Sequence, residues 1–276
     1  MRFKPFHKYG GVLGIAFVLT STNCRSQQSD PHFRDPVKPS PSTTAPDRIQ
    51  DEYWHSQFER VNKEVAGAEG SQLVFFGDSI TLMWSMEKAE GKAAWDKHFA
   101  KYRPINMGNS GDITPVMLYR ATQGNLDFAE GQAPRVAVLL CGTNNYGVAQ
   151  SDGGKVKWDL GMDTPPGEVA DGVLAVAQAF RRKLPATRVI VLGILPVENQ
   201  KKWAKCQETS RILASYDYPE DDVVFIDLKD RFLNSEGSIK PGLFKDGTHL
   251  TPEGYEVLAD ALEPHINRLI GMEPAK

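Results

Sequence analysis

The sequence predicts an α/β protein with a five-stranded parallel sheet, and two observations support this fold class. Five short apolar runs are rich in valine, isoleucine and leucine, as strands buried on both faces are. Segments with helical periodicity separate these runs, and strands that alternate with helices form parallel sheets through right-handed crossovers. We therefore expect helices on both sides of the sheet. The five runs are Leu73–Phe76, Pro104–Met107, Arg135–Cys141, Val189–Leu195 and Val223–Leu228.

Three of the helical segments carry apolar side chains along one face. The helix before the first strand has Trp54, Phe58, Val61 and Val65. The helix before the fourth strand has Val169, Val173, Val176 and Phe180. In the last helix, Thr251 can cap the amino terminus and Pro252 suits the first position. The inner face of that helix comprises Tyr255, Leu258, Leu262, Ile266 and Leu269.

Composition bounds the size of the core and the class of partner. The chain has 276 residues, of which 41% are hydrophobic and 24% charged, enough for one large α/β domain or two small ones. The formal net charge of −3 provides no broad basic field. We therefore expect neither nucleic acid nor an anionic membrane to be a main partner.

Residues 1–24 have the pattern of an export signal. Three basic residues precede the apolar stretch Gly11–Leu19, which is shorter than the about 20 residues that a bilayer-spanning helix needs. Cys24 follows closely and suggests a lipoprotein, although Asn23 stands where lipoproteins have a small residue. We expect an exported protein, periplasmic or extracellular, that contacts a membrane only if Cys24 carries lipid.

Residues 25–47 form a segment rich in proline, serine and threonine, which indicates a linker. The folded part is expected to span residues 48–276. Within it, Cys141 and Cys206 show no metal-ligand spacing, so we expect two unpaired core residues. Export would also permit a disulfide between them.

A serine directly follows the first predicted strand. Ser79 comes after Phe-Phe-Gly-Asp, on the turn that leaves the strand and opens a helix, where free backbone N–H groups face the sheet edge. The turn differs from the Gly-x-Ser-x-Gly elbow of ordinary α/β-hydrolases, because Thr81 occupies the position of the second glycine. A turn serine that merely caps a helix is the alternative interpretation.

A candidate base and acid lie three residues apart in Asp246-Gly-Thr-His249. His249 could accept the serine proton while Asp246 orients the imidazole. An Asp-Gly turn with a capping histidine is the simpler alternative, and Asp227 is a rival acid. The other histidines, His98 among them, are expected at the surface or in linkers.

The backbone N–H groups of Ser79 and Gly111 and the side-chain amide of Asn144 are candidate oxyanion donors. Gly111 lies in Asn-Met-Gly-Asn-Ser-Gly-Asp after the second predicted strand, and Asn144 lies in Gly-Thr-Asn-Asn after the third. Carboxyl ends of parallel strands form one edge of a sheet, where ligands bind. Donors at this edge could stabilise a tetrahedral intermediate.

Together these motifs resemble the conserved blocks of the SGNH (GDSL-like) hydrolase superfamily. The chain is most similar to bacterial relatives of the platelet-activating-factor acetylhydrolase catalytic subunits, over about residues 70–270. The resemblance implies a flavodoxin-like three-layer α/β/α sandwich and cofactor-free, metal-free hydrolysis of small acyl esters through an acyl-enzyme. It also implies the site roles: Ser79 as nucleophile, His249 as base, Asp246 as its orienting acid, and Ser79, Gly111 and Asn144 as oxyanion donors.

The loop Tyr146–Thr164 is longer than the corresponding connection in the animal enzymes. It leaves from the predicted oxyanion asparagine, so we expect it to border the substrate. Within it, Trp158 could stack on a sugar ring or anchor the loop to the body of the protein.

These features favour an exported serine esterase that removes acetyl groups from a carbohydrate. A lipid acetylhydrolase, a carbohydrate O-acetyltransferase and a non-catalytic glycan-binding protein are the alternatives. The expected partner is a small acyl ester or an acetylated glycan.

Overall fold

The computed structural model describes residue 33 and residues 37–44, 47–147, 161–219 and 222–271. The predicted export signal, including Cys24, lies outside these residues, as do Trp158 and most of the loop that contains it. None of the helices in the described ranges has both the length and the apolar character that crossing a bilayer requires.

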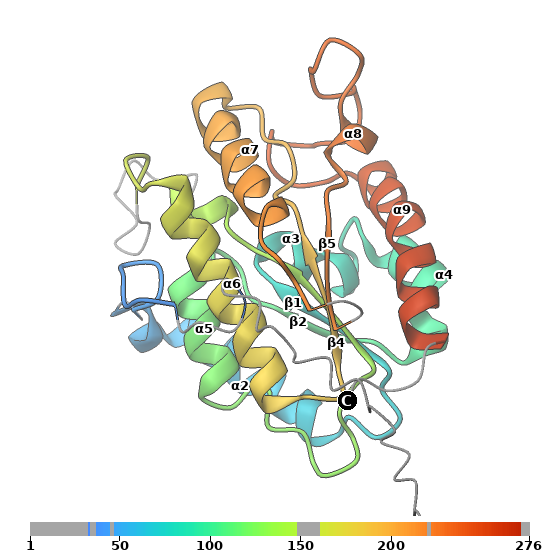
Figure 1. Cartoon of the computed structure of the whole chain (residues 1–276). Coiled ribbons are helices and arrows are strands. Elements are labelled where there is room, and N and C mark those ends of the chain that lie inside the picture. Colours follow the sequence, from blue (N-terminus) through green and yellow to red (C-terminus); the bar gives the residue numbers. More distant parts are fainter. Residues whose placement is uncertain (1–32, 34–36, 45–46, 148–160, 220–221, 272–276) are drawn as a thin grey trace, which may run out of the picture.

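The core of the fold is a five-stranded parallel sheet, as predicted (Figure 1). Its strand order is β2-β1-β3-β4-β5. The chain therefore moves from β1 outward to β2 and then crosses back to β3, which makes the β1/β3 boundary the topological switch point. The strands are β1 Leu73–Gly77, β2 Ile105–Gly108, β3 Val136–Leu140, β4 Arg188–Leu192 and β5 Val223–Ile226.

Strand bounds differ from the prediction mainly at the carboxyl ends. The fourth apolar run extends to Leu195, but β4 ends at Leu192. The Gly193 N–H still donates to the Ile226 carbonyl, and the next N–H, from Ile194, donates to the side chain of Ser210 instead of a strand. The apolar residues beyond β4 are buried in loops, so apolarity alone overestimates the strand.

Helices cover both faces of the sheet, which gives the expected three layers (Figure 1). One face packs against α2, α5, α6 and α7, and the other against α3, α4, α8 and α9. The bounds are α2 Glu52–Ala66, α3 Ser79–Ser85, α4 Lys92–Phe99, α5 Thr114–Thr122, α6 Pro166–Lys183, α7 Gln200–Ala214, α8 Lys229–Phe232 and α9 Pro252–Gly271. In the described ranges, the short 3₁₀ helices are η1 Asp47–Gln50, η2 Ala100–Tyr102 and η3 Thr143–Tyr146.

The apolar faces predicted for α2, α6 and α9 are the buried faces in the structure. The caps explain where two of these helices begin. Asp51 accepts a hydrogen bond from the backbone N–H of Trp54 at 2.8 Å, and Thr251 accepts one from Gly254 at 3.1 Å.

Part of the predicted linker packs against the domain instead of standing apart from it. Ser42 is fully buried, and its carbonyl accepts a hydrogen bond from Thr114 at 3.0 Å. Phe33 is buried in the core cluster beside α6. These isolated contacts bridge about 70 to 145 residues of sequence, so local composition could not indicate them.

Cys141 and Cys206 are both unpaired and buried, as expected. They belong to different hydrophobic clusters, one against the sheet and the other beneath α7. Burial raises the pKa of each thiol, that of Cys206 to about 12. Neither is placed to act as a nucleophile near neutral pH.

His98 is buried, and the expectation that it lies at the surface was wrong. Its Nδ1 lies 2.7 Å from Glu263 and its Nε2 lies 3.0 Å from Glu256, so the ring links α4 to α9. Lys97 and Lys101 contact the same two carboxylates. Burial lowers the pKa of His98, but the hydrogen bonds that its ring donates to the two carboxylates outweigh burial and raise the pKa above its ordinary value.

The contacts of His98 with Glu256 and Glu263 predict that the free energy of unfolding depends on pH. A raised folded-state pKa means that the charged ring contributes stability in full below about pH 6.5, and that this contribution is lost as pH rises through the folded-state pKa. His98→Gln should therefore unfold at a lower temperature than the native protein at pH 6, with a smaller difference at pH 9. Thermal unfolding followed by circular dichroism measures both; an equal difference at the two pH values would contradict the prediction.

Candidate active site

Ser79 lies at the carboxyl edge of the sheet, beside the topological switch point. It is the first residue of α3, and the side chain of Asp78 caps that helix by accepting from the Ile80 N–H at 3.0 Å. Gly77 permits the tight exit from β1, because a Cβ there would lie 2.7 Å from the Leu140 carbonyl of the neighbouring strand. The turn thus holds the serine at the edge where ligands bind in such sheets.

Ser79, His249 and Asp246 form a continuous chain of hydrogen bonds. The Ser79 hydroxyl lies 2.9 Å from His249 Nε2, and His249 Nδ1 lies 2.7 Å from an Asp246 carboxylate oxygen. The other Asp246 oxygen accepts from the backbone N–H groups of Thr248 and His249 at 3.1 and 2.8 Å. Nucleophile, base and orienting acid therefore have the mutual geometry of a serine triad.

The turn between the acid and the base fixes their positions and favours the ionised form of Asp246. Partial burial raises the pKa of Asp246, but hydrogen bonds from the His249 backbone and ring outweigh it, so the pKa is lower than usual. Gly247 has a φ of 76°, a left-handed conformation that favours glycine. Asp246 is consequently ionised near neutral pH and can stabilise an imidazolium.

The predicted oxyanion donors lie on the neighbouring loops. Gly111, with a φ of 71°, follows β2, and Asn144 lies on η3 just after β3. The Asn144 amide donates to the Asp112 carbonyl at 3.0 Å and approaches the Asp78 carboxylate at 3.4 Å. These two contacts hold the amide at the pocket that Ser79 and Gly111 also line.

The pocket has a volume of about 270 Å³ and a polar lining. Its walls contain Ser79, Ser110, Gly111, Asn144, Lys202, Asp246, Thr248 and His249. No large apolar side chain stands among them. In the part of the chain that the structure describes, no three His, Cys, Asp or Glu side chains gather as metal ligands.

A buried ion pair supports the loop that carries Gly111, and no sequence pattern indicated it. Arg120 of α5 and Asp112 are both fully buried and lie 2.8 Å apart. The guanidinium also donates to the carbonyls of Met107 and Gly77, at the ends of β2 and β1. Trp54 donates its ring N–H to Asp112 at 3.0 Å. Arg120 therefore connects the loop that carries Gly111 to the strand that precedes Ser79.

Asp78 is a fully buried acid next to the nucleophile. Burial raises its pKa to about 6, against the opposing effects of the Ile80 hydrogen bond and the His249 charge. Lys202, in the first turn of α7, is the other group that sequence reasoning missed. A lysine on an exposed helical segment gives no local signal that it faces a pocket.

One predicted candidate, Asp227, does not join the site, and the structure does not test another, Trp158. Asp227, the rival acid, accepts from the backbone and side chain of Lys229, both at 3.0 Å. Trp158 lies outside the described residues. Of the same loop, Tyr146 is buried, and its hydroxyl bonds to Thr209 of α7.

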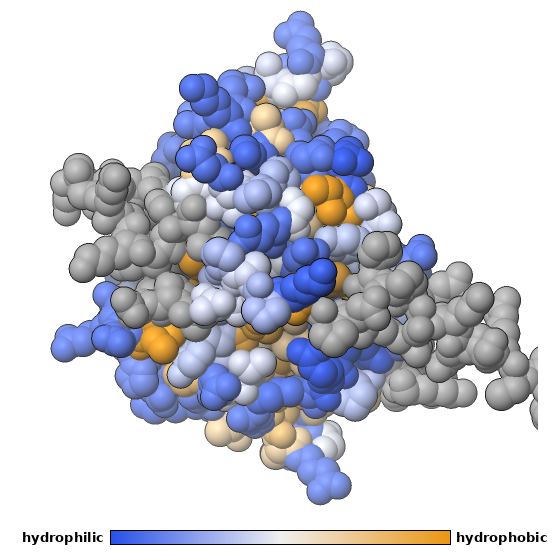
Figure 2. All heavy atoms as spheres, turned by 60° about the vertical axis from the view of Figure 1, so that its left-hand side comes forward, coloured by the Kyte–Doolittle hydropathy of each residue, from blue (hydrophilic) through white to orange (hydrophobic). Residues whose placement is uncertain are grey.

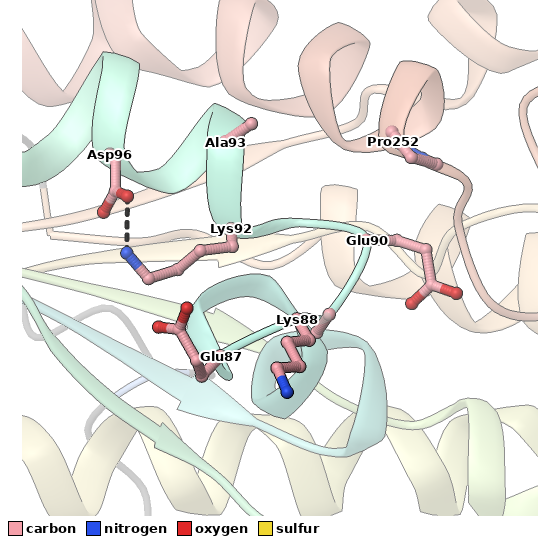
Figure 3. Close-up of a pocket in the computed structure, with 8 residues that line it drawn as sticks. Glu87, Lys88, Glu90, Lys92, Ala93, Asp96 and Pro252 are labelled. Carbon is pink, nitrogen blue, oxygen red and sulfur yellow. Dashed lines mark hydrogen bonds and ion pairs between the residues drawn. The ribbon is translucent and has the colours of Figure 1, made fainter.

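A second, larger hollow of about 630 Å³ lies between the start of α4 and the start of α9 (Figure 3). Its walls carry charged side chains such as Glu87, Lys88 and Lys92, and Lys92 pairs with Asp96. It contains no serine–histidine pair. We therefore assign the chemistry to the smaller pocket.

The Asn144 geometry predicts a selective loss of catalysis. Asn144→Ala removes one oxyanion donor and should lower kcat for ester hydrolysis by about 10²–10³-fold, with a smaller change in KM. Steady-state kinetics on a chromogenic acetate ester measures the loss. Asn144→Asp, which keeps the shape but lacks the donor, should fail in the same way while unfolding near the native temperature; native-like kcat in either variant would refute the assignment.

Comparisons with known proteins identify the family of the chain. The family model of the GDSL-like Lipase/Acylhydrolase family matches residues 75–257. Over 227 residues the chain is 28% identical to the Homo sapiens platelet-activating factor acetylhydrolase IB subunit alpha2, covering 81% of this chain and 88% of the relative.

Solved structures share the fold. A GDSL-like lipase from Bacteroides thetaiotaomicron aligns with a TM-score of 0.57 at 20% identity, over 79% of this chain and 99% of that one. A member of the lipolytic protein G-D-S-L family from Veillonella parvula aligns with a TM-score of 0.55 at 19% identity, over 71% and 98%. At such identities the likeness establishes the α/β fold alone.

Proposed function

Because the chain belongs to the GDSL-like lipase/acylhydrolase family and is a carboxylic ester hydrolase, we propose that it is an exported serine esterase that removes acetyl groups from a carbohydrate. The observation that carries the catalytic part of the proposal is the hydrogen-bond chain from Ser79 through His249 to Asp246, at 2.9 and 2.7 Å. A serine hydroxyl is a weak nucleophile until a neighbouring base can take its proton.

In the proposed mechanism, His249 Nε2 accepts the Ser79 proton as the hydroxyl oxygen attacks the ester carbonyl. The oxyanion that forms takes hydrogen bonds from the Ser79 and Gly111 backbone N–H groups and the Asn144 amide. His249 then gives its proton to the departing alcohol, which leaves an acetyl group on Ser79. A water molecule attacks this acyl-enzyme, again losing its proton to His249, and His249 then returns this proton to the Ser79 oxygen as acetate is released.

The size and lining of the pocket favour an ester substrate with a short acyl chain and a polar alcohol part. Its volume is about 270 Å³, and among the described residues its lining has no large apolar side chain to receive a long acyl chain. The face of the molecule shown in Figure 2 is mostly hydrophilic. Among the described residues, the exposed large hydrophobic side chains are Tyr53, Met86 and Met162, on separate segments. The relatives' description as acetylhydrolases also supports acetyl as the acyl group.

A substrate panel tests the proposed function. Purified protein is incubated with 4-nitrophenyl acetate, butyrate and octanoate and with acetylated xylan, and the release of nitrophenol and of acetate is measured. The proposal expects the acetate ester to be the best chromogenic substrate and free acetate to appear from the glycan. The acetyl-carbohydrate assignment would be refuted if the octanoate ester were hydrolysed fastest, or if no acetate were released from acetylated xylan.

A lipid acetyl ester is the second candidate, because the curated relatives are described as platelet-activating factor acetylhydrolases. An acetylated ether phospholipid in the same panel separates the two. Adding an unacetylated oligosaccharide tests acetyl transfer, since a transferase would yield acetylated acceptor in place of free acetate.

Export is proposed from the amino-terminal pattern of residues 1–24. Expression of the full chain in a bacterium, followed by cell fractionation and intact mass measurement, tests it. A processed chain outside the cytoplasm is expected. A mature chain that begins at Cys24 with added acyl mass would identify a lipoprotein, and an unprocessed cytoplasmic chain would contradict export.

A further inference from the structure

Lys202 lies in the wall of the catalytic pocket, although no step of the proposed hydrolysis uses it. It lines the pocket together with Ser79, Asn144 and His249. Its Nζ donates to the carbonyl of Gly147 at 2.7 Å. Lys202 therefore borders the pocket in which we propose that the ester binds.

Hydrogen bonds hold both the backbone and the side-chain ammonium of Lys202. Its backbone N–H donates to the side chain of Asn199 at 3.0 Å, which caps α7, and the next residue, Trp203, is buried beneath the helix. At the other end, the Nζ partner Gly147 directly follows η3 and donates its own N–H to the Asn144 carbonyl at 3.2 Å. The position of the ammonium group is thus coupled to the backbone that positions the oxyanion donor.

The two carboxylates near the pocket, Asp246 and Asp78, are each held by other interactions. Asp246 is occupied by its own turn, where three N–H groups of Thr248 and His249 bind it. Asp78 is fully buried beneath the pocket. Burial raises the pKa of Asp78 to about 6 while the charge of Lys202 acts in the opposite direction, so the field of the lysine reaches the residue next to the nucleophile.

We propose that Lys202 forms a subsite for an anionic group, a carboxylate or a phosphate, on the alcohol part of the ester. This proposal rests on the proposed function, because the position of the anion follows from the acetyl group. An acetyl group has no ionisable group, and in the proposed mechanism its carbonyl oxygen is directed to the donors of Ser79, Gly111 and Asn144. The charged group must then belong to the alcohol, which makes acetyl esters of anionic alcohols, such as acetylated uronic acids, the preferred substrate class.

A matched pair of chromogenic esters tests the subsite. One is 4-nitrophenyl acetate; the other is the acetate ester of 5-hydroxy-2-nitrobenzoate, a nitrophenyl ester with a carboxylate on the leaving group. The ratio of their kcat/KM values is compared among the native protein, Lys202→Gln, Lys202→Arg and Lys201→Gln. Lys201 is the control, because it removes the same charge from an exposed neighbouring position that does not line the pocket.

We expect Lys202→Gln to reduce the relative preference for the anionic ester by about three- to fivefold, the range of a partly exposed charge pair. Lys202→Arg should retain most of the preference, and Lys201→Gln should retain all of it. Raising the salt concentration should weaken the preference of the native protein. An unchanged ratio in Lys202→Gln, with the native protein active on both esters, would overturn the subsite and leave the proposed function standing.

Absence of turnover of both esters by the folded native protein would instead overturn the proposed function, and the subsite with it. Two further pairs distinguish the sources of the anion. Acetylated galacturonate is compared with its methyl ester, and acetylated glycerol 3-phosphate with acetylated glycerol. A preference that depends on Lys202 in the first pair identifies a carboxylate ligand, and one in the second pair identifies a phosphate; a preference in neither overturns the proposal.

Discussion

Replacing Ser79 with alanine is expected to lower kcat for 4-nitrophenyl acetate by at least about 10⁴-fold. The hydroxyl is the group that His249 activates at 2.9 Å, and removal of a nucleophile from a serine triad leaves only the contribution of the oxyanion donors and binding. Stopped assays of purified native and variant protein measure the loss, and circular dichroism shows that both are folded.

A serine remote from the site provides the matched control. Ser215 is exposed just after α7, and its hydroxyl bonds only to the carbonyl of Ile212 among the interactions described. Ser215→Ala should keep native kcat and KM. Residual activity in Ser79→Ala above a hundredth of the native value, in a preparation free of contaminating esterase, would remove Ser79 from the role of nucleophile.

Replacing Arg120 with methionine is expected to lower the free energy of unfolding by about 3–5 kcal/mol. The change removes the partner of a fully buried carboxylate, Asp112, and also the donors to the ends of β1 and β2. Urea unfolding followed by tryptophan fluorescence gives the free energy. Arg182→Met, on an exposed position of α6, should change it by less than about 0.5 kcal/mol.

A double variant separates the charge from the donors. Asp112→Asn in the Arg120→Met background removes the unpaired buried charge, so it should recover part of the lost stability. The donors to Met107 and Gly77 would still be missing, and full recovery is not expected. A loss below about 1 kcal/mol in Arg120→Met alone would mean that the buried pair does not support this edge of the sheet.

The sequence was sufficient to predict the sheet and the reactive groups, because both depend on local pattern. Continuous apolar runs marked the five strands, and a period of three to four residues identified the buried face of α2 before any contact was known. The spacing of Asp246 and His249 placed both side chains within one turn. Parallel strands then brought Ser79, Gly111 and Asn144 to one edge, since the carboxyl ends of such strands lie together.

The supporting residues could not be predicted in the same way, because their partners are distant in sequence. In the sequence, nothing distinguishes Arg120 from other helical arginines. Its role depends on the carbonyls at the ends of β1 and β2, to which it donates hydrogen bonds. His98 pairs with carboxylates 158 and 165 residues away. Ser42 lies in a segment whose composition predicts a linker, yet α5 and α6 bury it. Each depends on tertiary packing, which periodicity does not encode.

The nucleophile and its base are far apart in the sequence, and this determines when the chain can become active. Ser79 and His249 are 170 residues apart and meet only when the segment before α9 docks against the sheet edge. During synthesis from the amino terminus, the serine emerges long before the histidine that activates it. A nascent or partly folded chain therefore cannot hydrolyse esters, and the appearance of esterase activity reports the docking of α9.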